Sequence, residues 1–426
     1  MLTRMSRNIN RKIEPSLKNH DRTRVFRGIG QLVTLAKAAS RGGRHAVNED
    51  LQAISKAAIV AKDGVIVWVG QESKLPAAAK KSRDQVDLKG ATVIPGLIEC
   101  HTHLIFAGNR SAEFERRNQG ESYQSIAQSG GGILSTVRET RAATEVELRR
   151  IGQERVNRFV RQGVTTIEAK SGYGLTLKDE IKMLKAAGGL KKARIVPTFL
   201  GAHAVPKEFA SADAYVDELI ATYLPAIAAQ KLATRVDAFV EKGYFSAETT
   251  KRYLKAAAVL GLKSSIHAEQ LTLSGGAKLA IEMKSTSADH LVQLGPKEIA
   301  ALAKSAVACV LLPSADLYMD CAYPNARALI DQGAIVALST DFNPGTSPSQ
   351  DLALVGILAR VRMKMTLAET LVAYTIGSAH ALGLQSEIGS IEPGKSCDLA
   401  VLSGPIEELF LDVGRMPVAK TFYRAE

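Results

Sequence analysis

Eight short apolar runs, spaced along residues 93–345, limit the architectures open to this chain. Each run leads into a polar or glycine-containing turn, and amphipathic helical patterns such as residues 144–163 and 178–193 lie between several of them. Eight strand–helix units of this kind predict an α/β fold, a (β/α)8 TIM-like barrel with its helices outside. The runs are VIPGLIECHTH, VTTIEAKSGYG, RIVPTFLGAH, RVDAFVEKGYF, LKSSIHAEQ, TSADHL, AVACVLLPSAD and AIVALSTDFNPG.

The two ends of the chain have a different character. Residues 27–92 and 386–426 contain short β-branched runs, and the letters KDG at 62–64 predict a hairpin turn. Two β-rich segments at opposite ends of a chain can pair with each other. We therefore expect one small composite β-sandwich domain, with the barrel of residues 93–385 inserted between its two parts.

The positive charge of the chain is unevenly distributed. The formal net charge is +12, but residues 1–45 hold 11 Lys/Arg and only 2 Asp/Glu, which leaves the remaining residues close to neutral. Residues 1–26 lack the apolar segment of a secretory signal and are expected to form a basic, flexible arm. The charge therefore does not predict a folded nucleic-acid surface.

Hydropathy and cysteine usage restrict the setting of the protein. No apolar run of the sequence approaches the roughly 20 residues that a membrane-spanning helix needs, so we expect no membrane partner. The cysteines show no CxxC pair, which is typical of reduced thiols in a cytoplasmic protein. They are Cys100, Cys309, Cys321 and Cys397.

Polar and ionisable residues gather where the predicted strands end. In a parallel barrel the catalytic groups lie at the carboxyl ends of the strands. Five of the eight histidines follow this rule, together with several other polar side chains. The residues are His101, His103, Lys170, Tyr173, His203, Glu241, His267, His290 and Asp341.

His101 and His103 predict a metal site. Residues two apart in a strand point to the same side, and two imidazoles at a barrel mouth suit a metal ion of borderline hardness. His267 and Asp341 end later strands, and three nitrogens with one carboxylate leave room for water, as a catalytic site requires. Asp341 could combine ligation with proton transfer, and His290 is the other acid–base candidate.

Several longer motifs follow one another along residues 27–425. They are PGLIECHTH, IHAEQ, ADH, STDFNPG and GSIEPGKSCDLAVL, with FAGNR, YQSIAQSGGGILSTVRETR, EAKSGYGLTLKDEIKML and FLGAHAVP. The first five resemble the motifs of the amidohydrolase superfamily. The other four are similar to those of the imidazolonepropionase family within it.

This resemblance implies hydrolysis of the cyclic amide C–N bond of 4-imidazolone-5-propanoate to N-formimino-L-glutamate, the third step of histidine degradation. It also implies one zinc or iron ion per chain, held by His101, His103, His267 and Asp341. Homodimers are the commonest assembly of such enzymes, and we expect one here. The residues implied in contacts with substrate or product are Arg110, Tyr123, Tyr173, His203, Gln270, Asn343, Gly345 and Thr346.

The side chains of Arg110 and Gln270 indicate which roles these two residues can have. The planar guanidinium of Arg110 matches a carboxylate such as the propionate of the substrate. Gln270 stands three residues after His267, where some relatives have an acid. Because an amide cannot take a proton, a catalytic role of Gln270 is limited to hydrogen bonding, and proton transfer is expected from Asp341 and His290.

Three alternatives stay open at this point. A purine or pyrimidine deaminase shares the histidine and aspartate pattern but needs a glutamate where Gln270 stands. A binuclear cyclic-amide hydrolase needs a carboxylated lysine, for which Lys242 beside Glu241 is a candidate. A barrel that serves only as a scaffold would have lost part of the ligand set, and no member of the set is missing from the sequence.

Overall fold

A barrel of eight parallel strands forms the centre of the molecule. The computed structural model describes residues 22–426 except 122–124 and 127–129. The strands are hydrogen-bonded in chain order from β6 to β13, and the barrel closes where the amide of His103 donates to the carbonyl of Phe342 at 2.9 Å. The strands are β6 Leu97–Glu99, β7 Val164–Lys170, β8 Arg194–Ala202, β9 Arg235–Val240, β10 Lys263–Ala268, β11 Ser287–His290, β12 Ala308–Leu311 and β13 Ile335–Leu338. The predicted TIM-like barrel is confirmed.

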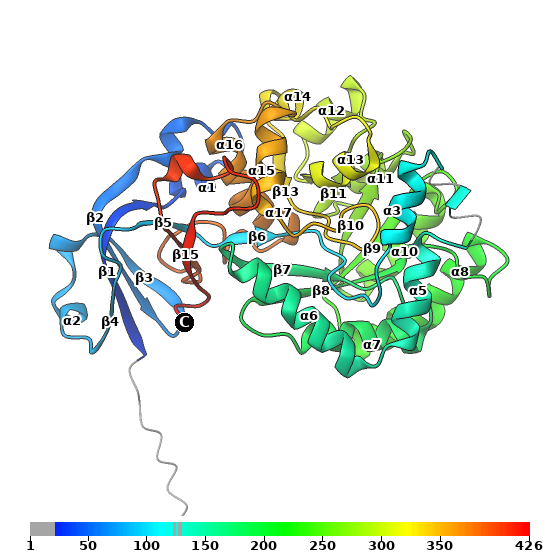
Figure 1. Ribbon diagram of the computed structural model, residues 1–426, viewed down its shortest axis with the longest axis horizontal. Helices are drawn as coiled ribbons and strands as arrows, with labels where there is room; N and C mark the ends of the chain where they lie inside the picture. Colours follow the sequence, from blue (N-terminus) through cyan, green and yellow to red (C-terminus); the bar gives the residue numbers. More distant parts are fainter. Residues whose placement is uncertain (1–21, 122–124, 127–129) are drawn as a thin grey trace, which may run out of the picture.

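Helices surround the barrel strands (Figure 1). Local signals begin many of them: Thr144 and Glu147 form a capping box at the start of α6, and Thr176 caps α7. Their bounds are α3 Ser111–Asn118, α5 Ile133–Ala142, α6 Glu145–Val160, α7 Leu177–Gly188, α8 Ala212–Glu218, α9 Leu224–Ala229, α10 Ala247–Val259, α11 Gly276–Glu282, α12 Pro296–Ala303, α13 Pro313–Met319, α14 Ala326–Asp331, α15 Leu352–Val361, α16 Leu367–Val372 and α17 Ser378–Leu382. Two π-helical stretches are η3 Leu219–Tyr223 and η4 Ala373–Gly377.

A seven-stranded sheet lies beside the barrel and combines both ends of the chain. Strand β1 pairs with β2, β4 and β5, and β14 joins β5 to β15. The turn between β2 and β3 has φ values of 52° at Asp63 and 80° at Gly64, as a tight hairpin turn requires. The strands are β1 Thr23–Val33, β2 Ala53–Lys62, β3 Val65–Gln71, β4 Asp84–Asp87, β5 Thr92–Pro95, β14 Leu399–Leu402 and β15 Val418–Phe422, with the short helices α1 Ala36–Ser40 and α2 Ala77–Lys80.

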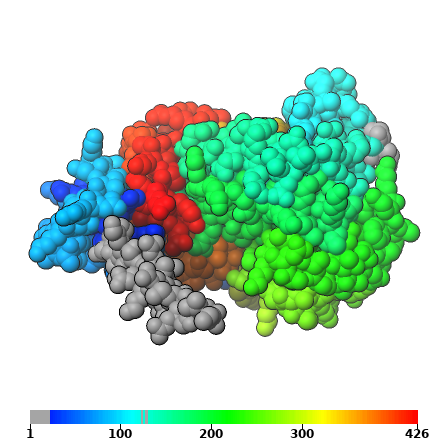
Figure 2. Space-filling model, turned by 90° about the horizontal axis from the view of Figure 1, so that it is seen from below, coloured from blue at the N-terminus to red at the C-terminus, as the bar shows by residue number. Residues whose placement is uncertain are grey.

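Apolar contacts join the two chain ends within this sheet domain. The rings of Phe26 and Phe422 lie 4.9 Å apart, and both side chains are buried. Strand β1 thus begins at Thr23, inside the stretch predicted as an arm, because its apolar side chains from Val25 onward are buried. Figure 2 shows the C-terminal segment between the N-terminal strands and the barrel, where the Thr421 hydroxyl donates to the Val160 carbonyl at 2.6 Å.

The barrel interior changes character along the strands. Toward the start of the strands it is apolar, with Ile98, Val196 and Ile335 in one buried cluster. Four of the strands also carry charged side chains that are at most 1% exposed. They are Glu99, Glu168, Lys170, Asp237 and Asp289. Within the part of the chain that the structure describes, no helix combines the length and the apolar character of a membrane span.

Candidate metal and substrate site

Three histidines and one aspartate converge at the carboxyl end of the barrel. His101 and His103 follow β6, His267 lies in β10, and Asp341 follows β13. The ligand atoms of the three histidines lie within 4.8 Å of one another. Asp341 Oδ1 lies 3.4 Å from His101 Nε2 and 3.5 Å from His103 Nε2, and His267 Nε2 lies 3.5 Å from His103 Nε2. The structure therefore brings the predicted ligand set to one point.

The chemistry of this group fits a metal ion. Bonds of about 2.1 Å, as zinc forms with histidine, place tetrahedral ligands about 3.4 Å apart, close to the distances observed. Among the described residues, His101 Nε2 and Asp341 Oδ1 are buried and have no hydrogen-bond partner. Buried polar atoms in proteins are seldom left in this state, and a cation between the four side chains would satisfy both atoms.

Carboxylates on the barrel wall orient two of the histidines. His101 Nδ1 lies 2.6 Å from Asp289 Oδ2 on β11, and His267 Nδ1 lies 3.1 Å from Asp237 Oδ2 on β9. A ring that donates its Nδ1 proton to a carboxylate keeps the Nε2 lone pair for a metal. Both Nε2 atoms face the common point. Asp237 and Asp289 were not named as site residues from the sequence, since each precedes the strand end at which the candidates were sought.

Burial controls the protonation of the site. It lowers the pKa of His101, His103 and His290 well below the ordinary value, so these imidazoles are neutral, as metal ligands and neutral donors must be. His267 differs, because Asp237 raises its pKa against the effect of burial. Burial also raises the pKa of Asp341 to about 7. A bound cation would favour the carboxylate form of Asp341.

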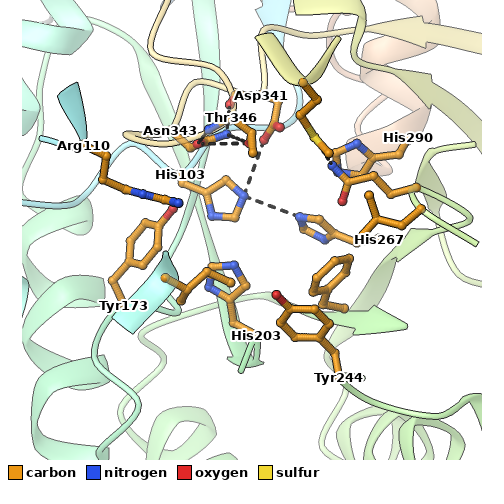
Figure 3. A pocket seen from close by; sticks show the side chains of 15 residues that line it. His103, Arg110, Tyr173, His203, Tyr244, His267, His290, Asp341, Asn343 and Thr346 are labelled. Atoms are coloured by element: carbon orange, nitrogen blue, oxygen red, sulfur yellow. Dashed lines mark hydrogen bonds and ion pairs between the residues drawn. The ribbon is translucent and has the colours of Figure 1, made fainter. Parts of the chain in front are cut away.

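A pocket adjoins the metal ligands, and most of the predicted substrate residues line it (Figure 3). Arg110 and Tyr173 lie on one side of His103, and His267 and His290 lie on the other. Gly345 is adjacent to the Arg110 guanidinium, and Tyr123 lies outside the described residues. The predicted residues that line the pocket are Arg110, Tyr173, His203, Gln270, His290, Asp341, Asn343 and Thr346.

Arg110 is held in place by its own helix and by a glycine. It directly precedes α3, is 8% exposed, and its Nε donates to Glu113 Oε2 at 2.7 Å. The other oxygen of Glu113 accepts the Gly132 amide at 2.9 Å. A Cβ at Gly345 would overlap the guanidinium. The charged fork is therefore fixed at the pocket wall.

The loop after β13 is shaped by Asn343. Its Oδ1 accepts the amides of Gly345 at 2.8 Å and Thr346 at 2.7 Å, and its Nδ2 donates to the Asp341 carbonyl at 2.7 Å. In the structure Asn343 itself engages these two amides, so its polar atoms support the loop that carries Asp341.

Gln270 and His290 lie on the opposite wall. Gln270 Nε2 donates to Met319 Sδ at 3.5 Å, and neighbouring Glu269 faces away, accepting the amides of Gly275 and Ala277. His290 has a φ of 79°, which non-glycine residues rarely adopt. Its ring centroid lies 5.2 Å from that of His267.

Lys170, Glu241 and Lys242 do not line the pocket. Lys242 is exposed, and the carboxylate of Glu241 accepts the amides of Leu271 and Thr272. Neither Glu241 nor Lys242 is therefore placed beside the four converging side chains, as a bridging lysine of a binuclear site would have to be. The pocket also contains apolar residues that the sequence did not single out, although Phe239 and Tyr244 belong to one of the eight runs. They are Ile133, Phe239, Tyr244, Leu271 and Met319.

Comparisons with known proteins agree with this geometry. The sequence profile of the Amidohydrolase family matches residues 92–424. The chain is 53% identical over 404 residues to a protein of Bdellovibrio bacteriovorus named imidazolonepropionase, covering 94% of this chain and 96% of the relative. It is 42% identical over 386 residues to the imidazolonepropionase of Symbiobacterium thermophilum, covering 89% and 90% of the two chains.

Solved structures share the fold at low sequence identity. E. coli guanine deaminase has a TM-score of 0.71 at 14% identity, with 95% of this chain and 98% of the other covered. A zinc-bound adenosine deaminase from Xanthomonas campestris has a TM-score of 0.68 at 19% identity, with 94% and 92% covered. At these identities the likeness concerns the fold alone.

Proposed function

The chain belongs to the amidohydrolase family and, within it, to the imidazolonepropionases, and from this premise we propose how its residues carry out the hydrolysis of 4-imidazolone-5-propanoate. The reaction opens the cyclic amide C–N bond and yields N-formimino-L-glutamate in histidine degradation. The observation that carries the proposal is the convergence of three buried histidines and Asp341 beside a pocket that contains Arg110.

One zinc or iron ion is proposed to be held by His101, His103, His267 and Asp341. Three imidazoles and one carboxylate suit either metal. When bound, the metal polarises the amide carbonyl and makes water more acidic. Asp237 and Asp289 keep two of the imidazoles oriented toward it.

The pocket wall that contains Arg110 is proposed to orient the substrate. The guanidinium of Arg110 binds the propionate as a planar fork. Tyr173 lies beside Arg110 (Figure 3), and its ring centroid is 5.2 Å from that of His203. Burial lowers the pKa of His203 to about 3, so this ring contacts the substrate as a neutral group. Fixing the tail in this way holds the reacting carbonyl at the metal ligands.

Proton transfer is assigned to Asp341 and His290. Asp341 accepts the proton of the attacking water and delivers it to the ring nitrogen that leaves, which requires a carboxylate within reach of both. The neutral His290 donates its N–H to the oxygen that gains charge in the transition state. Gln270 contributes hydrogen bonds, since its amide carries no transferable proton.

The main alternative is a purine or pyrimidine deaminase, which has the same pattern of histidines and aspartate in its site. Its mechanism needs a glutamate where this chain has Gln270, and the nearby carboxylate, Glu269, is bonded to backbone amides away from the pocket. A propionate can pair with the Arg110 fork through its negative charge, which a neutral nucleobase lacks. These two observations favour opening of the imidazolone ring.

Turnover and metal analysis of one preparation test the proposal. Purified protein is assayed with imidazolone propanoate by the loss of the ring chromophore and by formation of formiminoglutamate, while elemental analysis counts metals. We expect ring opening and one zinc or iron per chain. Two metals per chain would refute the mononuclear site, and release of ammonia from a purine or pyrimidine base without ring opening would establish the deaminase instead.

The cellular setting is proposed on chemical grounds. Four cysteines of the described chain are free, which suits the reducing cytoplasm. A homodimer is proposed from the prevalence of two-fold assemblies among such enzymes. Analytical ultracentrifugation of the purified protein measures whether it is a dimer.

A further inference from the structure

Lys170 is a buried cation inside the barrel, and the proposed reaction does not use it. It ends β7 and is 1% exposed. Its Nζ lies 2.8 Å from Glu168 Oε1 and 2.7 Å from Asp237 Oδ2. A single ammonium therefore joins two carboxylates that come from different strands, β7 and β9. Burial of three charged groups is costly unless each is paired, so their retention calls for a reason.

Glu168 connects Lys170 to the first pair of metal ligands. Its second oxygen, Oε2, accepts the backbone amide of Thr102 at 3.1 Å, and its carbonyl accepts the Thr102 hydroxyl at 2.5 Å. Thr102 stands between His101 and His103 in the chain. The position of Glu168 thus determines the backbone that carries both imidazoles.

Asp237 connects Lys170 to the third histidine. Its Oδ2, the atom that contacts Lys170, also lies 3.1 Å from His267 Nδ1. The Asp237 carboxylate therefore lies between the Lys170 ammonium and the His267 imidazole. It orients the ring through a contact that Lys170 stabilises.

We propose that Lys170 is a positioning residue of the metal centre: through Glu168 and Asp237 it sets the relative placement of the His101–His103 segment and His267. The inference rests on the metal site of the proposed function. Without the ammonium, the Glu168 and Asp237 carboxylates would repel each other and move apart, and water would enter between them. The His101–His103 segment and His267 would then no longer be held at a fixed distance from each other. Partners that orient metal-bound histidines change metal affinity by about 10- to 100-fold when they are removed.

Metal affinity and ligand geometry test this inference separately from catalysis. Wild type and Lys170→Met are stripped of metal and titrated with cobalt(II) in competition with a chelator, and the visible cobalt spectrum is recorded. Lys170→Met leaves two buried carboxylates against one another and can fail to fold. The double variant K170M/E168Q removes one positive and one negative charge and keeps an oxygen that can accept the Thr102 amide.

Arg235→Met provides the matched control. Arg235 is also a buried cation of the barrel, 2% exposed, but it begins β9 at the opposite end and donates to Thr286 Oγ1 at 2.9 Å. We expect the Lys170 variants to bind cobalt about 10- to 100-fold more weakly and to shift its absorption bands. Arg235→Met should lower the thermal midpoint of the metal-free protein, but its cobalt affinity and its cobalt absorption bands should match those of the wild type.

The outcomes separate the two proposals. Unchanged cobalt affinity and spectrum in a folded Lys170 variant would overturn the positioning role, and so would failure of both Lys170 variants to fold, which would assign the residue to stability alone. A wild-type protein that binds one metal but does not open the imidazolone ring would overturn the proposed function and leave the role of Lys170 intact.

Discussion

Arg110 and Gly345 depend on each other. The guanidinium occupies the space beside the α-carbon of Gly345, so that a methyl group there would overlap it. The importance of this glycine is thus steric: its φ does not lie in the left-handed region, and any residue could adopt its backbone conformation. A glycine at this position lets the charged fork reach the pocket wall.

Gly345→Ala should weaken substrate binding without unfolding the protein. The added methyl displaces the Arg110 guanidinium, and loss of the charge-assisted pair should raise KM by an amount equivalent to about 2 kcal/mol or more, with the metal content unchanged. Steady-state kinetics measure this. Gly188→Ala is the control, because no atom lies near its missing Cβ in α7. Equal KM values in both variants would show that Gly345 is not needed to place the Arg110 guanidinium.

Asp341 is proposed to act both as a metal ligand and as the proton carrier, and a substitution can separate these roles. Asp341→Asn keeps an oxygen that can ligate a metal but removes the group that accepts and delivers the proton. We expect turnover to fall by at least about 100-fold, the lower range for general acid–base catalysis, and metal content to fall far less. Elemental analysis and kcat measured on the same sample decide this. If both quantities decline in parallel, Asp341 acts as a ligand only. Gln270→Ala should be the milder change.

At the scale of elements, helix α7 holds the loop that carries Tyr173. Glu180 on this helix is fully buried, and its carboxylate accepts the amides of Gly172, Gly174 and Leu175 at 2.7–2.9 Å. The Gly172 carbonyl in turn lies 2.9 Å from His203 Nδ1. The placement of two substrate-facing rings therefore depends on one side chain of the next helix.

Glu180→Gln should loosen this loop. The new NH2 group faces the Gly172 amide, so that two donors meet where a hydrogen bond stood, at a cost of about 1–3 kcal/mol. We expect a lower thermal midpoint and a higher KM. Glu147→Gln is the matched control, because glutamine serves equally well in the capping box of α6. An unchanged KM in Glu180→Gln would show that the loop keeps its shape without the carboxylate.

At the scale of the whole molecule, we expect metal binding and folding to be coupled. The proposed ligands come from the segment after β6, from β10 and from the segment after β13, so only the closed barrel assembles them. A ligand that binds the native state alone stabilises it by about 2.7 kcal/mol at a free concentration 100 times its Kd. Removal of the metal with a chelator should therefore lower the thermal midpoint, and addition of zinc or iron should restore it. Calorimetry that finds equal midpoints would contradict the coupling.

The sequence by itself predicted the barrel and grouped the four candidate metal ligands. Strand and helix periods are local properties, and eight alternating units have few compact arrangements. Once the barrel is inferred, residues at the ends of its strands must meet, which is why His101, His103, His267 and Asp341 could be grouped in advance. Arg110 was named because the family resemblance implied it, and a planar cation suits a carboxylate substrate.

Only the tertiary structure decided which side chains pair within the barrel. Lys170 contacts Asp237 on another strand, and Asp289 contacts His101 at the end of a different strand, so no local pattern indicates these contacts. The role of Gly345 depends in the same way on a guanidinium more than 200 residues away in the chain. Sequence patterns specify which residues can reach a common place, whereas closure of the barrel sets the distances and orientations at which they meet.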